Sequence, residues 1–190
     1  MSTKAPFNLR AAPSTDLWRI PPSTDRKNGN LIHASNALTS LKSATISFKA
    51  SYIHQFDQAG LIVRLTHPSH PLPKWIKTGI EYFDGEPRIS VVCCDNYSDW
   101  SVASLPASIS DAVTKGEQEI TIRLEVKETT VWIYRVGEDG KDVPLREIAW
   151  LFADGGKGWT AEIGACVARP AEEPKDEFEA TFTKLDVQWK

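Results

Sequence analysis

The chain has 190 residues, and its 25 acidic and 22 basic side chains leave a net charge of −3. This near balance excludes the basic footprint of a nucleic-acid-binding protein and of a polybasic membrane binder. The apolar runs are far shorter than the ~20 residues needed to cross a bilayer. We therefore expect no nucleic-acid or membrane partner, in a chain long enough to bury about 70% of its unfolded surface without a disulfide or a metal.

The first residues, MSTKAPFNLRAAPSTDLWR, contain no unbroken apolar segment of the kind that a secretory signal requires. Three cysteines, of which Cys93 and Cys94 are adjacent, do not resemble a disulfide framework. Adjacent residues in a strand point to opposite faces, which suits reduced thiols. These features predict a cytoplasmic protein. The adjacent cysteines could sense oxidation only if Cys94 were exposed and had a low pKa.

Residues 1–14 are expected to be an irregular lead-in, and residues 15–190 to form a single domain. The composition rich in Pro, Ser, Thr and Asn continues to about residue 30. Within it, Leu17 and Trp18 are the apolar side chains expected to pack this segment onto the domain, and Asn28-Gly29 predicts a turn.

Beyond residue 30, almost every segment alternates apolar and polar residues, which is typical of half-buried strands. Residues 67–73 contain three prolines and are predicted to form a loop, because proline cannot donate to a ladder. Residues 104–113 hold at most a short helical turn. Strands without a helix to cover them predict an all-β sandwich of two antiparallel sheets. The predicted strands are residues 45–49, 60–66, 75–83, 88–94, 119–126, 131–136, 147–152, 161–167 and 178–189.

The acids in GIEYFDGEPRISVVCCDNYSDWS, residues 79–101, could form a catalytic pair or the corner of a hairpin. Retaining glycosidases need two carboxyl groups about 5–5.5 Å apart. Acids at i and i+2 or i+4 of one strand can supply them, or at i+5 where a bulge shifts the register. Here Glu81, Asp84 and Glu86 stand at i, i+3 and i+5, and Asp84-Gly85 is a strong hairpin signal. We predict that the chain reverses between residues 81 and 86. This leaves Glu81 beside Lys77, as an ion pair rather than an acid/base dyad.

The same region resembles a known family. The segments KWIKTGIEYFDGEPRISVV and NYSDWS are similar to the concanavalin A-like domain-of-unknown-function family that includes the regulation-of-enolase protein. The later segments VWIYRVGEDGKDVPLREI and EIGACVARP fit the same pattern, so the resemblance spans residues 15–190. It implies a jelly-roll sandwich and, for at least one member, control of enolase during the use of alternative sugars. It implies no established catalytic activity, and no cofactor is expected.

Strand alternation places a group of polar and aromatic side chains on the face of one sheet that points away from the core. Such a concave face could hold a sugar, with aromatic rings stacking on it and charges fixing its hydroxyl groups. Gly79 would leave room for the ligand to approach. The alternative is a solvated face with cross-strand ion pairs, and Asp99-Trp100 is interpreted as a turn capped by a buried indole. The predicted binding residues are Arg64, Trp75, Lys77, Glu81 and Ser90, with Arg123 and Tyr134 added from later strands, where Glu125 and Trp132 also lie.

Three functional hypotheses follow. The leading one is a non-catalytic, cytosolic regulatory or interaction protein with enolase as its possible partner. The second is binding of a carbohydrate or sugar phosphate on the concave sheet. The third is a glycoside hydrolase or lyase, which would require Glu125 or Glu162 as a partner for Glu81. His67 and His70 stand in a proline-rich segment without a nearby Cys or acid, so no metal site is predicted.

Overall fold

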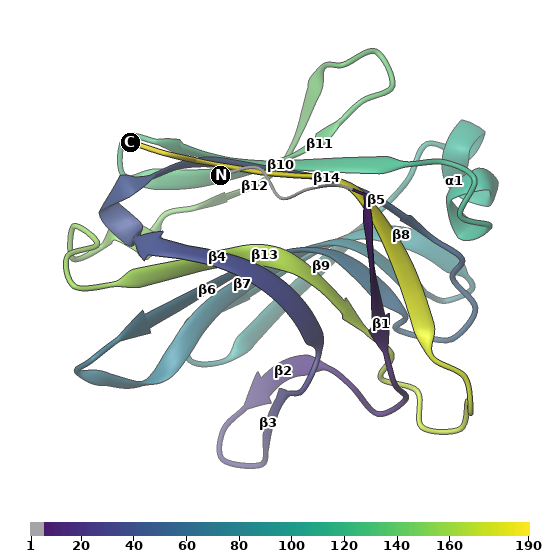
Figure 1. The fold of residues 1–190 in the computed structure, drawn as a ribbon, viewed down its shortest axis with the longest axis horizontal. Helices are drawn as coiled ribbons and strands as arrows, with labels where there is room; N and C mark the ends of the chain where they lie inside the picture. The colour runs from purple at the N-terminus through teal and green to yellow at the C-terminus, as the bar shows by residue number, and fades with distance from the viewer. Residues whose placement is uncertain (1–5) are drawn as a thin grey trace.

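The computed structural model describes residues 6–190 as two six-stranded antiparallel sheets packed face to face (Figure 1). The first sheet has the order β1-β14-β5-β10-β11-β12, with β1 (Phe7–Ala11), β5 (Leu41–Ala50), β10 (Ile120–Lys127), β11 (Thr130–Val136), β12 (Asp142–Ile148) and β14 (Phe178–Trp189). The second has the order β4-β13-β6-β7-β8-β9, with β4 (Asn30–Ala37), β6 (Gln58–His67), β7 (His70–Phe83), β8 (Glu86–Cys94), β9 (Ser98–Ser104) and β13 (Thr160–Ala168). The predicted all-β jelly-roll sandwich is confirmed.

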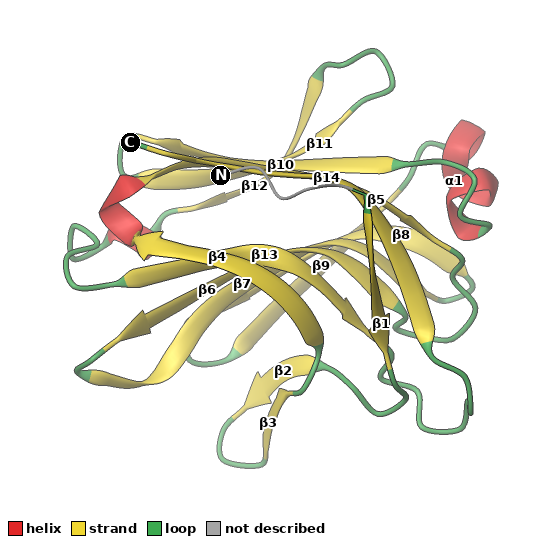
Figure 2. Cartoon of the chain, in the orientation of Figure 1, coloured by secondary structure: helices red, strands yellow, loops and turns green. Residues whose placement is uncertain are grey.

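Helices play a small part in this fold. Figure 2 shows α1 (Ala107–Thr114) at one end of the sandwich, and the 3₁₀ turn Leu38–Ser40 at the other. A second 3₁₀ turn spans Trp150–Phe152. Within residues 6–190, no helix combines the length and the apolar character that a membrane crossing demands.

The core lies between the two sheets and is built by the alternation seen in the sequence. Ile46 and Phe48 of β5 face Leu61 and Val63 of β6 from the opposite sheet, and all four are at most 1% exposed. Because alternate side chains of each strand point inward, each sheet has one face free to be solvated or covered.

The predicted reversal at Asp84-Gly85 is confirmed. Strand β7 ends at Phe83 and pairs directly with β8 from Glu86 onward. Asp84 and Gly85 have φ angles of 53° and 76°, as a two-residue type I′ turn requires. The turn separates Glu81 from Glu86, so the three acids do not line up on one strand.

The predicted loop at residues 67–73 is wrong. Strands β6 and β7 join through the tight turn at Pro68-Ser69, with His67 paired to His70, and Pro71 and Pro73 lie within β7. Proline is tolerated there because β7 extends beyond its other neighbour: the last residue of β8, Cys94, pairs with Trp75.

The expectation of an irregular lead-in is also wrong where the structure describes it, because Phe7–Ala11 forms β1 and pairs with β14. The alternation that buries Leu9 and Ala11 is short but regular. Residues 1–5 of the lead-in lie outside the described residues. Further along, β2 (Leu17–Ile20) and β3 (Thr24–Lys27) form a separate hairpin beneath the concave face of the second sheet (Figure 1).

A buried ion pair holds the loops beside this hairpin. The Asp57 carboxylate and the Arg169 guanidinium are 0% and 1% exposed and form two parallel hydrogen bonds of 2.8 and 2.9 Å. Asp57 Oδ2 also accepts the backbone N–H groups of Ile53 and His54. Arg169 reaches Asp176 as well, so one guanidinium joins the segment before β6 to the segment after β13.

Replacing Arg169 with Met should destabilise the fold by about 3–5 kcal/mol, because the Asp57 carboxylate would stay buried without its counter-charge. Chemical denaturation measures this loss. The matched control is Arg10→Met, since Arg10 pairs with Glu179 on the surface and its loss should barely change the free energy of unfolding. Equal, small losses for both variants would contradict the role given to the buried pair.

Candidate functional site

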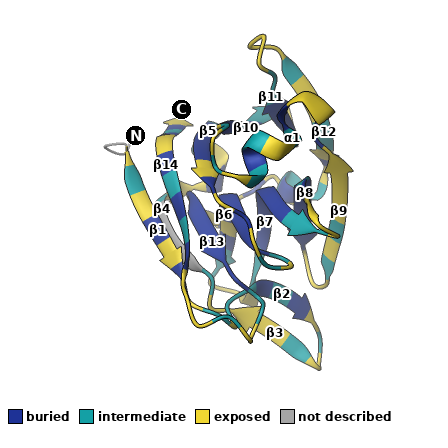
Figure 3. Cartoon of the chain, turned by 90° about the vertical axis from the view of Figure 1, so that its right-hand side faces the viewer, coloured by how far each residue is buried: buried dark blue, intermediate teal, exposed yellow. Residues whose placement is uncertain are grey.

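The β2–β3 hairpin covers the centre of the concave face, so this face is not the open surface expected from the sequence. Trp75, Lys77, Glu81 and Ser90 share the face as predicted, but each is only 4–6% exposed. Leu17 and Arg19 of β2 are buried, whereas most of β3 is exposed (Figure 3). Beneath the hairpin lies a second apolar cluster, separate from the sandwich core, formed by Leu17, Ile62, Trp75, Val92, Cys94 and Cys166, with Trp18 and Trp100 packed against it. The expected packing of Leu17 and Trp18 is confirmed.

Lys77 ties the hairpin to the sheet. Its ammonium group donates to the Leu17 carbonyl oxygen at 3.0 Å and to Asp16 Oδ1 at 3.2 Å. The same Asp16 oxygen accepts the Leu17 backbone N–H at 2.7 Å and the Gln58 amide at 3.4 Å. The predicted ion pair between Lys77 and Glu81 is therefore wrong, because Asp16, over sixty residues earlier in the chain, provides the counter-charge.

Arg19 provides a second tie. It is 2% exposed, and its guanidinium donates to the Pro73 carbonyl oxygen at 2.8 Å and to Asp25 at 3.0 Å. Its backbone N–H donates to Ser98 Oγ at 2.8 Å. The hairpin is thus anchored to both β7 and β9.

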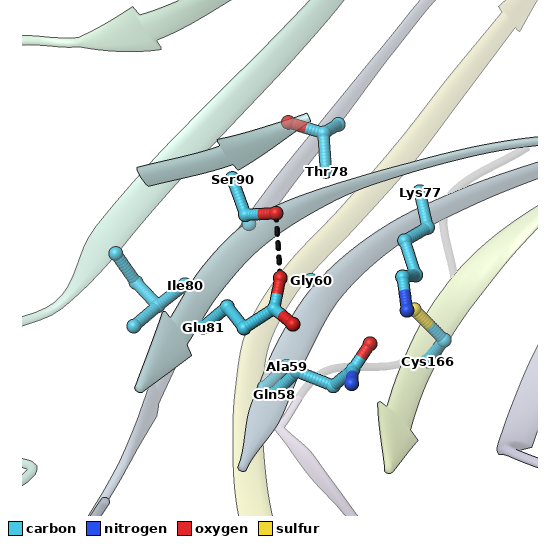
Figure 4. A pocket seen from close by; sticks show the side chains of 10 residues that line it. Gln58, Ala59, Gly60, Lys77, Thr78, Ile80, Glu81, Ser90 and Cys166 are labelled. Atoms are coloured by element: carbon cyan, nitrogen blue, oxygen red, sulfur yellow. Dashed lines mark hydrogen bonds between the residues drawn. The ribbon is translucent and has the colours of Figure 1, made fainter. Parts of the chain in front are cut away.

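Glu81 is a buried carboxylate with one oxygen bound and one available. Oε2 accepts Ser90 Oγ at 2.8 Å and the Trp100 indole N–H at 3.0 Å. Burial raises the pKa of Glu81, and the nearby Lys77 charge and these two donors only partly oppose the rise. Oε1 receives no hydrogen bond from the residues that the structure describes. Figure 4 shows it on the side of Gln58, the residue opposite Glu81 in the β6–β7 ladder.

Gly79 allows two strands to approach closely and does not make room for a ligand. It pairs with Gly60, and a Cβ at either position would lie 2.1 Å from a backbone oxygen of the opposite strand. The glycine pair therefore lets β6 and β7 approach closely. Above it, Lys77, Glu81 and Ser90 line a small space of about 10 Å³, enough for one water-sized molecule.

A larger cleft of about 240 Å³ opens between the hairpin and the sheet, and we call it the hairpin cleft. It shares Lys77 and Glu81 with the small space. Charged groups and aromatic rings thus face the same volume from different elements. Its lining is Asp16, Trp18, Arg26, Phe56, Lys77, Glu81, Trp100 and Pro170.

Aromatic rings support one wall of the hairpin cleft. The Trp100 ring packs edge-on against Phe83, with centroids 4.9 Å apart, and Phe56 stacks on Phe83 at 5.7 Å. Phe56 has a φ of 67°, which is rare for a bulky residue and costs energy. Its N–H donates to the Tyr82 carbonyl oxygen at 2.7 Å, and its neighbour Asp57 belongs to the buried ion pair. The surrounding structure therefore imposes this conformation.

Two predicted binding residues lie in the other sheet, and their assignment to this patch is wrong. Arg64 shares the concave face as predicted, directly opposite Trp75, and pairs with Glu162 at 2.9 Å. It stands six residues along β6 from Gln58, the partner of Glu81, or roughly 20 Å at 3.3 Å per residue. Arg123 and Tyr134 belong to β10 and β11 of the other sheet, as do Glu125 and Trp132.

The same geometry places both predicted catalytic partners of Glu81 too far away to act with it. Glu162 pairs with Arg64 at that distant position, and Glu125 lies in the opposite sheet. A hydrolase built on either pair is therefore contradicted, since carboxyl groups of glycosidases lie within about 10 Å of one another.

The sequence reasoning missed several residues that line the hairpin cleft. Asp99-Trp100 is not a turn, because both residues lie in β9, where Trp100 pairs with Val92. The alternation of Ser98, Trp100 and Val102 was the available signal. Asp16, Arg26, Phe56 and Pro170 reach the cleft only through tertiary packing.

The cysteines do not support a redox sensor. Cys94 is 0% exposed and burial raises its pKa, so it is neither accessible nor activated. Burial raises the pKa of Cys93 to about 11 and that of Cys166 to about 12. Among the side chains that the structure describes, those of residues 6–29 and 34–190, no three His, Cys, Asp or Glu gather as metal ligands do.

Comparison with known proteins identifies the family. The model of the family described as "Protein of unknown function (DUF1349)" matches residues 1–189. The chain belongs to the DUF1349 family. This DUF1349 protein is 35% identical to an uncharacterised protein of Emericella nidulans over 186 residues, which cover 97% of this chain and 86% of the relative. It is 30% identical to Regulation of enolase protein 1 of Saccharomyces cerevisiae over 142 residues, or 74% of this chain and 64% of that protein.

Solved structures share the sandwich of this DUF1349 protein. A functionally unknown protein from Saccharomyces cerevisiae superposes with a TM-score of 0.74 at 21% identity, over 100% of this chain and 96% of that one. A GH43 protein of Bacteroides ovatus gives a TM-score of 0.66 at 14% identity, over 97% of this chain and 33% of that one. At these identities the likeness of the structures shows the fold alone. The family resemblance stated from the sequence is confirmed by the match to the family model.

Glu81→Gln should stabilise the DUF1349 protein at pH 7. Because the folded pKa of Glu81 lies above its ordinary value of 4.5, ionised Glu81 lowers stability at neutral pH. The stability that the protonated Glu81 side chain contributes is fully present only below the ordinary pKa, and it is lost as the pH rises through the folded pKa. The advantage of Gln should therefore shrink as the pH falls from 7 towards the ordinary value.

Urea denaturation at several pH values measures this difference. The control is Glu86→Gln, an exposed carboxylate in the same β7–β8 hairpin. An advantage of Gln at position 81 that does not change with pH would show that the pKa of Glu81 is not raised.

Proposed function

We propose that this protein is a non-catalytic binding protein that holds a carbohydrate ring in the hairpin cleft. The observation that carries the proposal is the combination of aromatic walls, Trp18 and Trp100, with a floor of fixed charges, Lys77 and Glu81. Aromatic faces stack on the apolar faces of sugar rings, while polar groups placed at the base select the hydroxyl groups.

The floor offers both an acceptor and a donor. Glu81 Oε1 is an acceptor on a carboxylate whose other oxygen is fixed by Ser90 and Trp100. Lys77 has three N–H donors and uses two of them, on Asp16 and on the Leu17 carbonyl. A donor and an acceptor held rigidly side by side suit a pair of neighbouring sugar hydroxyls.

The size of the cleft favours a small ligand. Its volume of about 240 Å³ falls below the range of roughly 300–1,000 Å³ typical of sites for drug-sized ligands. We therefore propose one sugar ring, or the end of a chain, rather than a long oligosaccharide.

Two features support binding rather than hydrolysis. Asp16 and Glu81 are the acids of the cleft, and Asp16 is engaged by the Lys77 ammonium and two further donors through one oxygen. Glu81 in turn is hydrogen-bonded by Ser90 and Trp100. A glycosidase needs one carboxyl group free to deliver a proton and a second free to attack or to activate water.

Calorimetry against a panel of mono- and disaccharides tests the proposal. Trp18→Ala should weaken binding at least about tenfold, or 1.4 kcal/mol, because it removes one stacking surface. Tyr97→Ala, which truncates a 56% exposed ring outside the cleft, should bind as the native protein does. A native protein that gives no heat with any sugar would refute the proposal, as would unchanged affinity in the Trp18 variant.

A second candidate function is direct control of enolase in the cytoplasm. Its support is the 30% identity to Regulation of enolase protein 1. The free, buried thiols of Cys93, Cys94 and Cys166 suit a reducing compartment. If this function holds, purified enolase should be retained on the immobilised protein and should change its turnover when the protein is added. Enolase that neither binds nor changes its activity would rule out this partner.

A further inference from the structure

Among the charged side chains that line the hairpin cleft, Arg26 stands apart because no residue in the described chain pairs with it. Arg26 lies on β3 directly opposite Trp18 of β2. Residues directly opposite in an antiparallel pair project to the same face. Both side chains accordingly line the cleft, while Arg26 stays exposed at its mouth.

Its neighbours all have partners. Asp25 accepts from Arg19 at 3.0 Å and from Lys27 at 3.3 Å, so the nearest acid in sequence is already engaged. Lys77, the other cation of the cleft, is neutralised by Asp16. The guanidinium of Arg26 is thus the cleft cation whose charge is not balanced by any side chain of residues 6–29 and 34–190.

We propose that the sugar bound in the hairpin cleft carries an anionic group, a carboxylate or a phosphate, and that Arg26 receives it. This inference rests on the proposed function. The planar guanidinium matches either oxyanion through two parallel hydrogen bonds. It stands beside Trp18, on which the ring would stack.

The charges of the cleft also orient the ligand. Glu81 lies at the floor of the cleft, where its carboxylate repels the anionic group of the ligand. The same carboxylate accepts hydrogen bonds from hydroxyl groups. Arg26 is exposed at the mouth. The ring therefore enters with its hydroxyl groups towards Lys77 and Glu81 and with its anionic group towards Arg26.

Calorimetry with glucose, glucuronate, glucose 6-phosphate and inorganic phosphate tests this inference on the native protein, Arg26→Gln and Lys27→Gln. Lys27 is the matched control, because it is the next residue on β3, is 73% exposed and pairs with Asp25 outside the cleft. We expect the native protein to bind at least one of the two charged sugars about tenfold or more tightly than glucose. Arg26→Gln should abolish that preference, whereas Lys27→Gln should keep it.

Whichever of glucuronate and glucose 6-phosphate binds more tightly shows whether the anionic group is a carboxylate or a phosphate. Equal affinity for charged and neutral sugars in the native protein would overturn the role of Arg26 and leave the proposed function standing. A preference that survives in the Arg26 variant would overturn it as well. Absence of binding by every sugar, or inorganic phosphate binding as tightly as glucose 6-phosphate, would refute this inference and the stacking on which the proposed function depends.

Discussion

The buried ammonium group of Lys77 is the constraint on which the candidate site depends. It joins Asp16 and the Leu17 carbonyl at the start of the hairpin to the middle of β7. An ion pair this deeply buried adds little net stability, yet removing one partner leaves an uncompensated charge at a cost of about 3–5 kcal/mol. Its effect is therefore one of placement, since the hairpin has to lie over the concave face for both charges to be satisfied.

The other unusual features of the molecule gather around that placement. The carboxylate of Glu81 is buried with one oxygen unused, Phe56 holds a positive φ, and Arg26 has no counter-charge in the described residues. The buried carboxylate and the positive φ each lower stability, and such features persist where the surrounding structure imposes them, often at functional sites. Arg26 is exposed, so its missing counter-charge costs little. Their convergence on one cleft, away from the sandwich core, is the physical reason to place function there.

The strands and the Asp84-Gly85 turn could be predicted because their causes are local. Period-two alternation fixes which side chains of a strand share a face, and an Asp-Gly pair fits the φ angles of a type I′ turn. Alternation does not reveal which sheet a strand joins, so Arg123 and Tyr134 were assigned to the wrong face. It also does not reveal that residues 17–27 return to cover the concave face, so the prediction places Lys77 and Glu81 on an open face.

The candidate site was accordingly predicted only in part. Lys77, Glu81 and Ser90 could be predicted because side chains alternate along the neighbouring strands β7 and β8. Asp16 and Arg26 reach the cleft from a segment whose sequence carries no period-two signal. The three prolines near His67 gave a wrong prediction of a loop for a related reason. The energetic cost of a proline depends on whether a neighbouring strand needs the missing N–H, and this is a property of the sheet.

A crystal structure of the protein grown with saturating glucuronate would locate the ligand independently of any change in stability. We expect a sugar ring in the hairpin cleft, between Trp18 and Trp100, with hydroxyl groups on Glu81 and Lys77. An empty cleft beside sugar bound elsewhere on the protein would contradict this expectation.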